Sequence, residues 1–166
     1  MFNNYDLSFK LTEITMLIIR NLREIQRFRK PVIALGVFDG LHLGHIKILN
    51  SVVRRASEIN GRSVVVTFWP HPQKKESIYS LEHRLLLLRT IGIDACVVVR
   101  FDKEFSDVSP RDFVKKLLVK KLAAHTIYVG ENFRFGKGAK GDANLLKRFA
   151  KEYNFNLRLF KVIRKN

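Results

Sequence analysis

Two histidines stand three residues apart in a short stretch that is rich in glycine. His42 and His45 flank Gly44 in the run GVFDGLHLGH. If this run opens a helix, residues three apart lie on one face, so both imidazoles would point to the same side. A helix start offers unpaired backbone N–H groups and the positive end of the helix dipole, and both attract phosphate. Two imidazoles there can donate to phosphate oxygens and stabilise charge that develops at a reacting phosphorus.

The residues around this run predict the strand and the helix that would position the histidines. An apolar run without helical period precedes it, as expected of a strand covered on both faces: Val32, Ile33, Ala34, Leu35 and Val37. Apolar residues then recur at steps of three and four from Ile46 to Ile59, and Gly61 stands past the expected helix end. An isolated HxGH is more often ordinary polar surface, but this one follows a strand and opens a helix. We therefore favour a phosphate site, in which Gly44 lets a phosphate approach the backbone.

GVFDGLHLGH resembles the GxFDGxHxGH signature of the bacterial FAD synthetase family, the FMN adenylyltransferase half of bifunctional riboflavin kinase/FAD synthetase. More broadly, it is similar to the HxGH nucleotidyltransferases. The resemblance extends over residues 16–166. It implies that His42 and His45 are catalytic, and that the ATP site consists of these residues: Gly36, Phe38, Asp39, His42, Gly44 and His45.

A second stretch with the family's pattern follows an expected strand at residues 63–68. The TFxPHP motif is matched by Thr67, Phe68, Pro70, His71 and Pro72. The two prolines stiffen this loop, which leaves the carboxyl end of a strand, where ligands sit in open α/β sheets. The resemblance implies that the loop borders a flavin site containing Phe68, Pro70, His71 and Pro72. Trp69 offers a flat ring for stacking on the flavin, although a tryptophan packed within the loop is the more common case.

A third stretch, residues 130–142, contains four glycines and two lysines. Such a stretch is expected to be a flexible loop with exposed N–H groups suited to anions, and a basic hairpin is the alternative. The family's GxxFxFGxxxxGD pattern is matched by Gly130, Phe133, Phe135, Gly136, Gly141 and Asp142. The resemblance places Asn132 and Phe133 at the flavin nucleotide and the ATP side of the pocket, and it adds Phe135 to the flavin set.

Apolar strands and helical patterns alternate along the chain. We expect a strand and a helical turn from Met16 onward, further strands at 32–37, 63–68, 95–101, 126–129 and 156–162, and helices at 46–59, 81–91, 110–121 and 143–153. Ser80 and Gly92 are expected to cap the second helix, and Asp142 the last. Phe101, Asp102 and Phe105 either line a pocket or form core and turn. The alternation predicts an α/β fold, a Rossmann-like parallel sheet with helices on both faces, of the HxGH nucleotidyltransferase type.

The composition points to anionic partners. The chain has 31 Lys and Arg against 15 Asp and Glu, a net charge of +16, which favours nucleotides, flavin phosphates or nucleic acid. No RNA-binding signature accompanies the charge, so nucleic acid is the less expected partner. The single cysteine, Cys96, lies in an apolar run and predicts a buried, reduced thiol in a cytoplasmic protein. The apolar runs are too short to span a bilayer, and residues 1–10 do not read as a signal peptide.

The chain departs from the family near its end. The family carries a second phosphate motif, a Ser/Thr pair followed by an arginine (like SSTxIR), which by resemblance holds the ATP phosphates opposite HxGH. This chain ends in FKVIRKN without that motif and without a riboflavin kinase domain. We therefore expect either a fragment or a shortened natural form, with an extension at residues 1–15 and an adenylyltransferase domain at 16–166. Without the arginine, ATP binding would weaken by about one to two orders of magnitude, leaving flavin binding stronger than turnover suggests.

The resemblance implies ATP and FMN as substrates, FAD and pyrophosphate as products, and Mg²⁺ bound with ATP instead of by protein ligands alone. Two other hypotheses about the function remain open. One is a different HxGH adenylyl- or cytidylyltransferase, which the PHP and ENFRFG loops argue against. The other is a non-catalytic basic module that binds nucleotide or nucleic acid.

Overall fold

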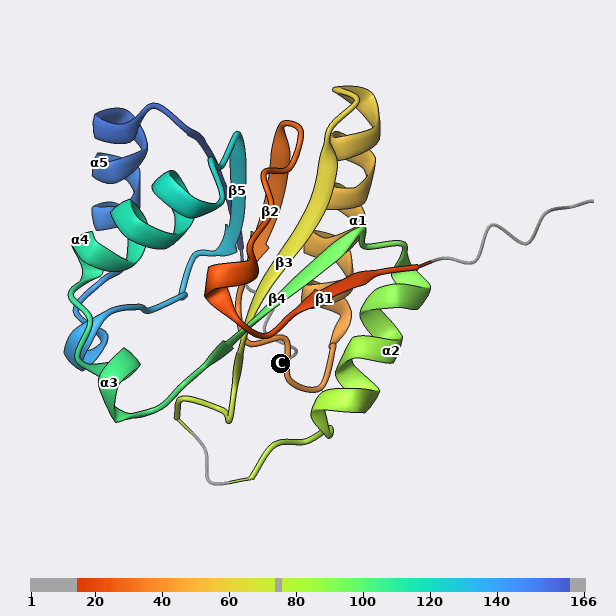
Figure 1. Cartoon of the computed structure of the whole chain (residues 1–166), viewed down its shortest axis with the longest axis horizontal. Helices are drawn as coiled ribbons and strands as arrows, with labels where there is room; N and C mark the ends of the chain where they lie inside the picture. Colours follow the sequence, from red (N-terminus) through yellow and green to blue (C-terminus); the bar gives the residue numbers. More distant parts are fainter. Residues whose placement is uncertain (1–14, 74–75, 162–166) are drawn as a thin grey trace, which may run out of the picture.

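A parallel sheet forms the centre of the protein. The computed structural model describes residues 15–73 and 76–161, so the expected extension at 1–15 lies almost wholly outside the described residues. Within them, six strands pair in the order β1-β4-β3-β2-β5-β6, and every pairing is parallel (Figure 1). The strands are β1 (Leu17–Ile19), β2 (Pro31–Leu35), β3 (Arg62–Trp69), β4 (Ala95–Arg100), β5 (Thr126–Gly130) and β6 (Asn156–Phe160).

Helices cover both faces of this sheet. α1 (Leu43–Glu58) and α2 (Leu81–Ile91) pack on one face, and α4 (Pro110–Asp112), η2 (Phe113–Lys121) and α5 (Ala143–Tyr153) pack on the other (Figure 1). Successive side chains of a strand point to opposite faces. In β2, Val32 and Ala34 accordingly join the core under α1 and α2, while Ile33 and Leu35 join the core under η2 and α5. The predicted Rossmann-like α/β fold is confirmed.

Local capping signals predicted both ends of α2 and the start of α5 correctly. α2 runs from Leu81 to Ile91 as expected, with the Ser80 side chain accepting from the His83 N–H at 3.1 Å and Gly92 in the left-handed region at φ +99°. The Asp142 carboxylate caps α5 by accepting from the Leu145 N–H at 2.8 Å. Short elements complete the chain: η1 (Leu22–Glu24), α3 (Lys103–Ser106) and η3 (Lys137–Ala139).

Several boundaries differ from the expectation; β3 extends to Trp69 instead of Phe68, and β4 ends at Arg100 instead of Phe101. β2 ends at Leu35, so Val37 belongs to the following turn. The helix expected at 110–121 begins at Pro110 but continues from Phe113 as a π-helix, with the Leu122 N–H donating to the Leu117 carbonyl at 3.0 Å. β6 ends at Phe160, and Val162 lies outside the described residues. Within the described part of the chain, no helix is long and apolar enough to cross a membrane.

The order of the strands fixes where ligands can bind. The chain builds β2, β3 and β4 outward in one direction and then places β5 on the other side of β2. Ligands of open α/β sheets bind beyond the carboxyl ends of the strands at such a reversal. α1 begins here, directly after β2, and carries the HxGH residues at its start.

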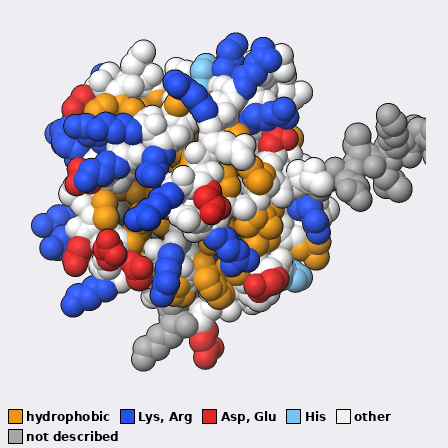
Figure 2. Space-filling model, in the orientation of Figure 1, with side chains coloured by type: hydrophobic (Ala, Val, Ile, Leu, Met, Phe, Trp, Pro, Cys, Tyr) orange, Lys and Arg blue, Asp and Glu red, His pale blue; other side chains and the backbone are white. Residues whose placement is uncertain are grey.

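Basic side chains cover much of the surface. Figure 2 shows Lys and Arg distributed over several parts of one face, with Asp and Glu among them, and not one continuous basic stripe. Scattered charges of this kind are typical of a solvated surface, whereas a nucleic-acid-binding surface usually has a continuous basic patch or stripe.

Candidate active site

The two histidines of HxGH stack at the start of α1. His42 is the N-cap residue, and Leu43 begins the helix. The two imidazole rings lie with centroids 3.7 Å apart and an angle of 24° between their planes. Gly44 leaves room for this arrangement, since a Cβ at this position would lie 3.3 Å from atoms of the His42 ring. The expectation that both rings share one face agrees with this geometry.

The surroundings of His45 favour its neutral form. Burial, and after it the neighbouring His42, lowers the pKa of His45 to about 4, although Asp39 acts in the opposite direction. Its Nδ1 atom is buried and has no hydrogen-bond partner among the described residues, and Phe38 meets the ring edge-on at 5.3 Å. A neutral imidazole donates through one ring nitrogen and accepts through the other, and a nearby anion would raise its pKa again.

A cavity of about 400 Å³ opens over this pair; we call it the histidine cavity, since His42, His45 and His71 line it. The ends of β2, β5 and β6 contribute Leu35, Gly130 and Phe160 to its wall. All residues that the resemblance assigned to ATP line it: Gly36, Phe38, Asp39, His42, Gly44 and His45. His71, which the resemblance assigned to the flavin, faces this cavity and is absent from the lining of its neighbour.

A second cavity, of about 430 Å³, adjoins the first. We call it the phenylalanine cavity because aromatic rings line it: Phe68, Phe101, Phe105, Phe113, Phe133 and Phe135. Pro72 and Asn132 also line it, so most of the expected flavin residues meet here, whereas Pro70 lines neither cavity. The two cavities share one wall, made of Val37, Gln73, Asn132 and Phe133. A ligand in one cavity therefore lies next to a ligand in the other.

The segment 130–142 is a packed hairpin. Phe135 and Gly141 form an antiparallel bridge, with N–H···O distances of 3.1 and 2.8 Å in the two directions. The Lys137 N–H donates to the Val108 carbonyl at 2.8 Å. Gly136 has φ +74°, and a Cβ there would lie 2.6 Å from backbone atoms of Pro110. The hairpin alternative therefore describes the backbone, and this packing holds Phe133 and Phe135 against the phenylalanine cavity.

Asp39 is buried and its oxygens are already engaged. Its carboxylate accepts from the N–H groups of Ile78 at 2.9 Å and Tyr79 at 3.1 Å. Burial alone would raise the pKa of Asp39, but these two hydrogen bonds and the charge of Arg84 lower it on balance, so the group is ionised. Arg84 is fully buried and lies 3.8 Å from the carboxylate.

Arg84, Phe113 and Gln73 were not predicted as site residues. Arg84 had a signal in the sequence, because it lies on the same helical face as Leu81, Leu85 and Leu88, which the structure buries. Phe101 and Phe105 had two interpretations, and the structure places both at the phenylalanine cavity. Trp69 lines neither cavity, and the Arg84 guanidinium lies 5.5 Å from its ring centroid. Trp69 is therefore a packed residue, but it ends β3 and does not belong to the loop.

Comparison with known proteins agrees with this geometry. A family model described as FAD synthetase matches residues 24–166. The bifunctional riboflavin kinase/FMN adenylyltransferase of Buchnera aphidicola subsp. Acyrthosiphon pisum is 31% identical over 159 residues, covering 91% of this chain and 51% of that protein. The protein with the same description from Escherichia coli K12 is 31% identical over 151 residues, covering 86% of this chain and 48% of the relative.

A solved structure shares the fold. A Streptococcus pneumoniae protein described as a macrolide-efflux protein superimposes with a TM-score of 0.76 at 22% identity, covering 91% of this chain and 51% of its own. At that identity the likeness bears on the fold alone. The chain spans about half the length of the curated relatives it matches. Because the family match covers most of the chain, from residue 24 to residue 166, this protein belongs to the FAD synthetase family.

Proposed function

We propose that the chain is an FMN adenylyltransferase, which transfers AMP from ATP to FMN and gives FAD and pyrophosphate. The shared wall between the two cavities carries the proposal, because it brings an aromatic compartment next to a histidine pair at a helix start. The family membership and the names of the relatives support the same reaction.

Each cavity suits one substrate. The phenylalanine cavity would take the flavin ring system, because aromatic side chains contact large flat apolar rings favourably. The histidine cavity would take the phosphates of ATP at the N-terminus of α1, where Gly44 lets the backbone be approached. Asn132, in the shared wall, would face both ligands and mark where they meet.

The reaction requires positioning and charge stabilisation. A phosphate oxygen of FMN forms a bond to the α-phosphorus of ATP, while the bond from that phosphorus to the bridging oxygen breaks and pyrophosphate leaves with the electron pair. No covalent enzyme intermediate is required. His42 and His45 would donate to the phosphate oxygens on which charge builds up, and holding the two substrates in line would supply much of the rate. The negative charge of the bound phosphates would itself favour the protonated form of His45.

Mg²⁺ is proposed as the companion of ATP. Among the described residues, no group of three or more His, Cys, Asp and Glu side chains is arranged to hold a metal ion. Asp39 lines the histidine cavity, but its oxygens accept from Ile78 and Tyr79. Mg²⁺ commonly binds through substrate phosphates and retained waters, and when bound it would neutralise phosphate charge.

We also propose a cytoplasmic location. Cys96 is a free and fully buried thiol, and burial raises its pKa to about 12. A free thiol of this kind is common in reducing compartments.

The direct test is FAD formation from ATP, FMN and Mg²⁺. The His42→Ala, His45→Ala double variant should lose well over tenfold in rate, since removing a single donor to a developing oxyanion costs about 10²–10³ elsewhere. His83→Ala is the matched control, because His83 is exposed and lines neither cavity. Wild-type protein that forms no FAD, or a double variant with unchanged turnover, would overturn the proposal.

Two further measurements test the two alternative functions. In a panel of nucleoside triphosphates and phosphorylated acceptors, an acceptor consumed faster than FMN would reassign the chain to another HxGH transferase. Salt-sensitive RNA binding that FMN does not compete away would favour a basic binding module.

A further inference from the structure

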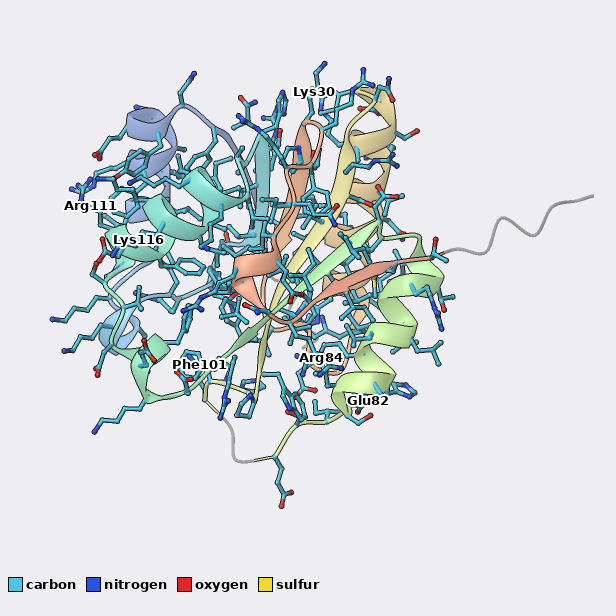
Figure 3. The ribbon with its side chains drawn as sticks, viewed as in Figure 1. Lys30, Glu82, Arg84, Phe101, Arg111 and Lys116 are labelled. Carbon is cyan, nitrogen blue, oxygen red and sulfur yellow. The ribbon has the colours of Figure 1, made fainter. Side chains whose placement is uncertain are left out.

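The buried arginine of α2 reaches the turn that precedes the histidines. The Arg84 guanidinium is fully buried near the carboxyl ends of the central strands, at the end of the sheet where Figure 3 also labels Phe101. Its Nη1 donates to Thr67 Oγ1 at 3.1 Å and to the Phe68 carbonyl at 3.0 Å. The Thr67 hydroxyl in turn donates to the Val37 carbonyl at 2.7 Å. Arg84 is thus connected to β3 directly and, through Thr67, to the turn that follows β2.

Packing alone does not explain a cation at this position. The residues on the same face of α2, Leu81, Leu85 and Leu88, are apolar and buried. A buried charge is costly unless it is matched, and the Nε and Nη2 atoms of Arg84 have no hydrogen-bond partner among the described residues. Its compensation is the Asp39 carboxylate, 3.8 Å from Nη2, and the ring of Trp69.

Asp39 links this charge to the histidine pair. By accepting from Ile78 and Tyr79, it ties the segment that precedes α2 to the turn at residues 36–41. Within this turn Phe38 and Leu41 have φ of +55° and +30°, in the left-handed region that side chains disfavour. Such a conformation persists only when its surroundings hold it. Phe38 contacts the His45 ring, and His42 follows the turn directly.

We infer that Arg84 is a positioning residue for the histidine cavity, acting through Asp39 on the turn 36–41 and so on His42 and His45. Arg84 lines neither cavity and therefore touches neither substrate. The identity of the ligands, ATP and FMN, rests on the proposed function. A positioning role through Asp39 predicts a larger effect on ATP than on FMN, since Val37 is the one residue of the turn that also lines the phenylalanine cavity. General damage would reduce FMN binding equally, because Arg84 also binds the carbonyl of Phe68, which lines the phenylalanine cavity.

The test compares four single variants with the wild type. For Arg84→Met, Arg84→Lys, Asp39→Asn and Arg89→Met, ATP binding is measured by calorimetry, FMN binding by fluorescence, and FAD formation with each substrate varied. Arg84→Met should reduce kcat/KM for ATP by roughly ten- to a hundredfold, as a small misplacement of reacting groups does, with a much smaller loss of FMN affinity. Arg84→Lys should recover most of this loss because the charge beside Asp39 remains. Arg89→Met is the control, an exposed arginine of the same helix.

A double-variant cycle then asks whether Arg84 acts through Asp39. If it does, Arg84→Met combined with Asp39→Asn should lose no more than either single variant, because groups that act as a unit are not additive. Additive losses, wild-type ATP kinetics in Arg84→Met, or an equal loss of FMN affinity would each refute the inference. If Arg84→Met does not fold, Asp39→Asn must show the larger loss for ATP and Arg84→Lys must retain activity. If the wild type binds ATP and FMN but forms no FAD, the proposed function fails, while the ATP titrations still decide the role of Arg84.

Discussion

The rings of Phe68 and Phe133 face each other in the phenylalanine cavity, with planes 24° apart and centroids 6.5 Å apart. Phe68 comes from β3 and Phe133 follows β5, and β2 lies between these two strands in the sheet. Two distant parts of the sequence thus supply opposing aromatic surfaces of one compartment.

We expect Phe133→Ala to weaken FMN binding by about tenfold, because stacking on an aromatic side chain contributes roughly 1–3 kcal/mol and ~1.4 kcal/mol is tenfold. Phe133→Leu keeps an apolar wall without a ring and should lose less. Quenching of FMN fluorescence measures both affinities. Equal affinities for Phe133→Ala and the wild type would show that this ring does not contact the flavin.

The lowered pKa of His45 predicts a stability that depends on pH. Its pKa is about 4 in the folded protein against an ordinary value of 6.5, so between these values the unfolded chain binds more protons than the folded one. The free energy of unfolding should therefore fall as the pH drops from 6.5 towards 4, by at most ~1.4 kcal/mol per pH unit. Denaturant titrations of the wild type and of His45→Gln isolate this contribution, because glutamine does not titrate. Parallel curves for the two proteins would contradict the assignment.

Gly136 and Gly138 form a matched pair for testing the hairpin. Both have positive φ, but a Cβ on Gly136 would lie 2.6 Å from Pro110, whereas one on Gly138 would have no atom nearer than 3.8 Å. Gly136 has φ +74° and ψ 177°, a region open almost only to glycine, whereas Gly138 has φ +63° and ψ 20°, in the left-handed region. Backbone strain and the contact with Pro110 therefore both make alanine more costly at Gly136. Gly136→Ala should lower the free energy of unfolding by about 1–3 kcal/mol more than Gly138→Ala. Both glycines line the phenylalanine cavity, and Gly136→Ala should weaken FMN binding more because it also disturbs the packing of the hairpin on Pro110. Denaturant titration and FMN fluorescence provide the two readouts.

Gly44→Ala should separate stability from activity. Alanine favours a helix over glycine by roughly 0.5–1 kcal/mol, so the variant should be as stable as the wild type or more so. Its Cβ would lie 3.3 Å from the His42 ring and displace it. We expect FAD formation to fall by about tenfold, in line with the sensitivity of reaction rates to small misplacements. A variant that is more stable and fully active would show that the stacking of His42 does not matter.

The sequence predicted those features that short-range patterns determine. Ser80 and Gly92 delimit α2 because a cap needs only its own turn, and HxGH could be placed because a strand and a helix flank it directly. The π-helix at Phe113–Lys121 has no such local signal. His71 lines the histidine cavity because the loop after β3 folds back towards β2, which no spacing along the chain reveals.

Arg84 is the clearest case of a residue whose role could not be predicted from the sequence. It lies on the helical face of Leu81, Leu85 and Leu88 and is buried with them, yet arginine is among the residues least often buried, so residue type and periodicity indicate different environments. Only the three-dimensional proximity of Thr67, Phe68 and Asp39 accounts for a cation there.

Because the strand order reverses at β2, bound substrates should stabilise the pairing of β2 with β5. Each cavity takes one part of its lining from residues before 74 and another from residues after 129. A bound substrate therefore contacts both sides of the pairing between β2 and β5. A ligand that binds only the assembled form adds RT ln(1 + [L]/Kd) to the free energy that holds it together. Bound substrate should therefore slow the separation of β2 from β5, and the rate of proteolysis near these two strands would report the fraction of sites that are occupied.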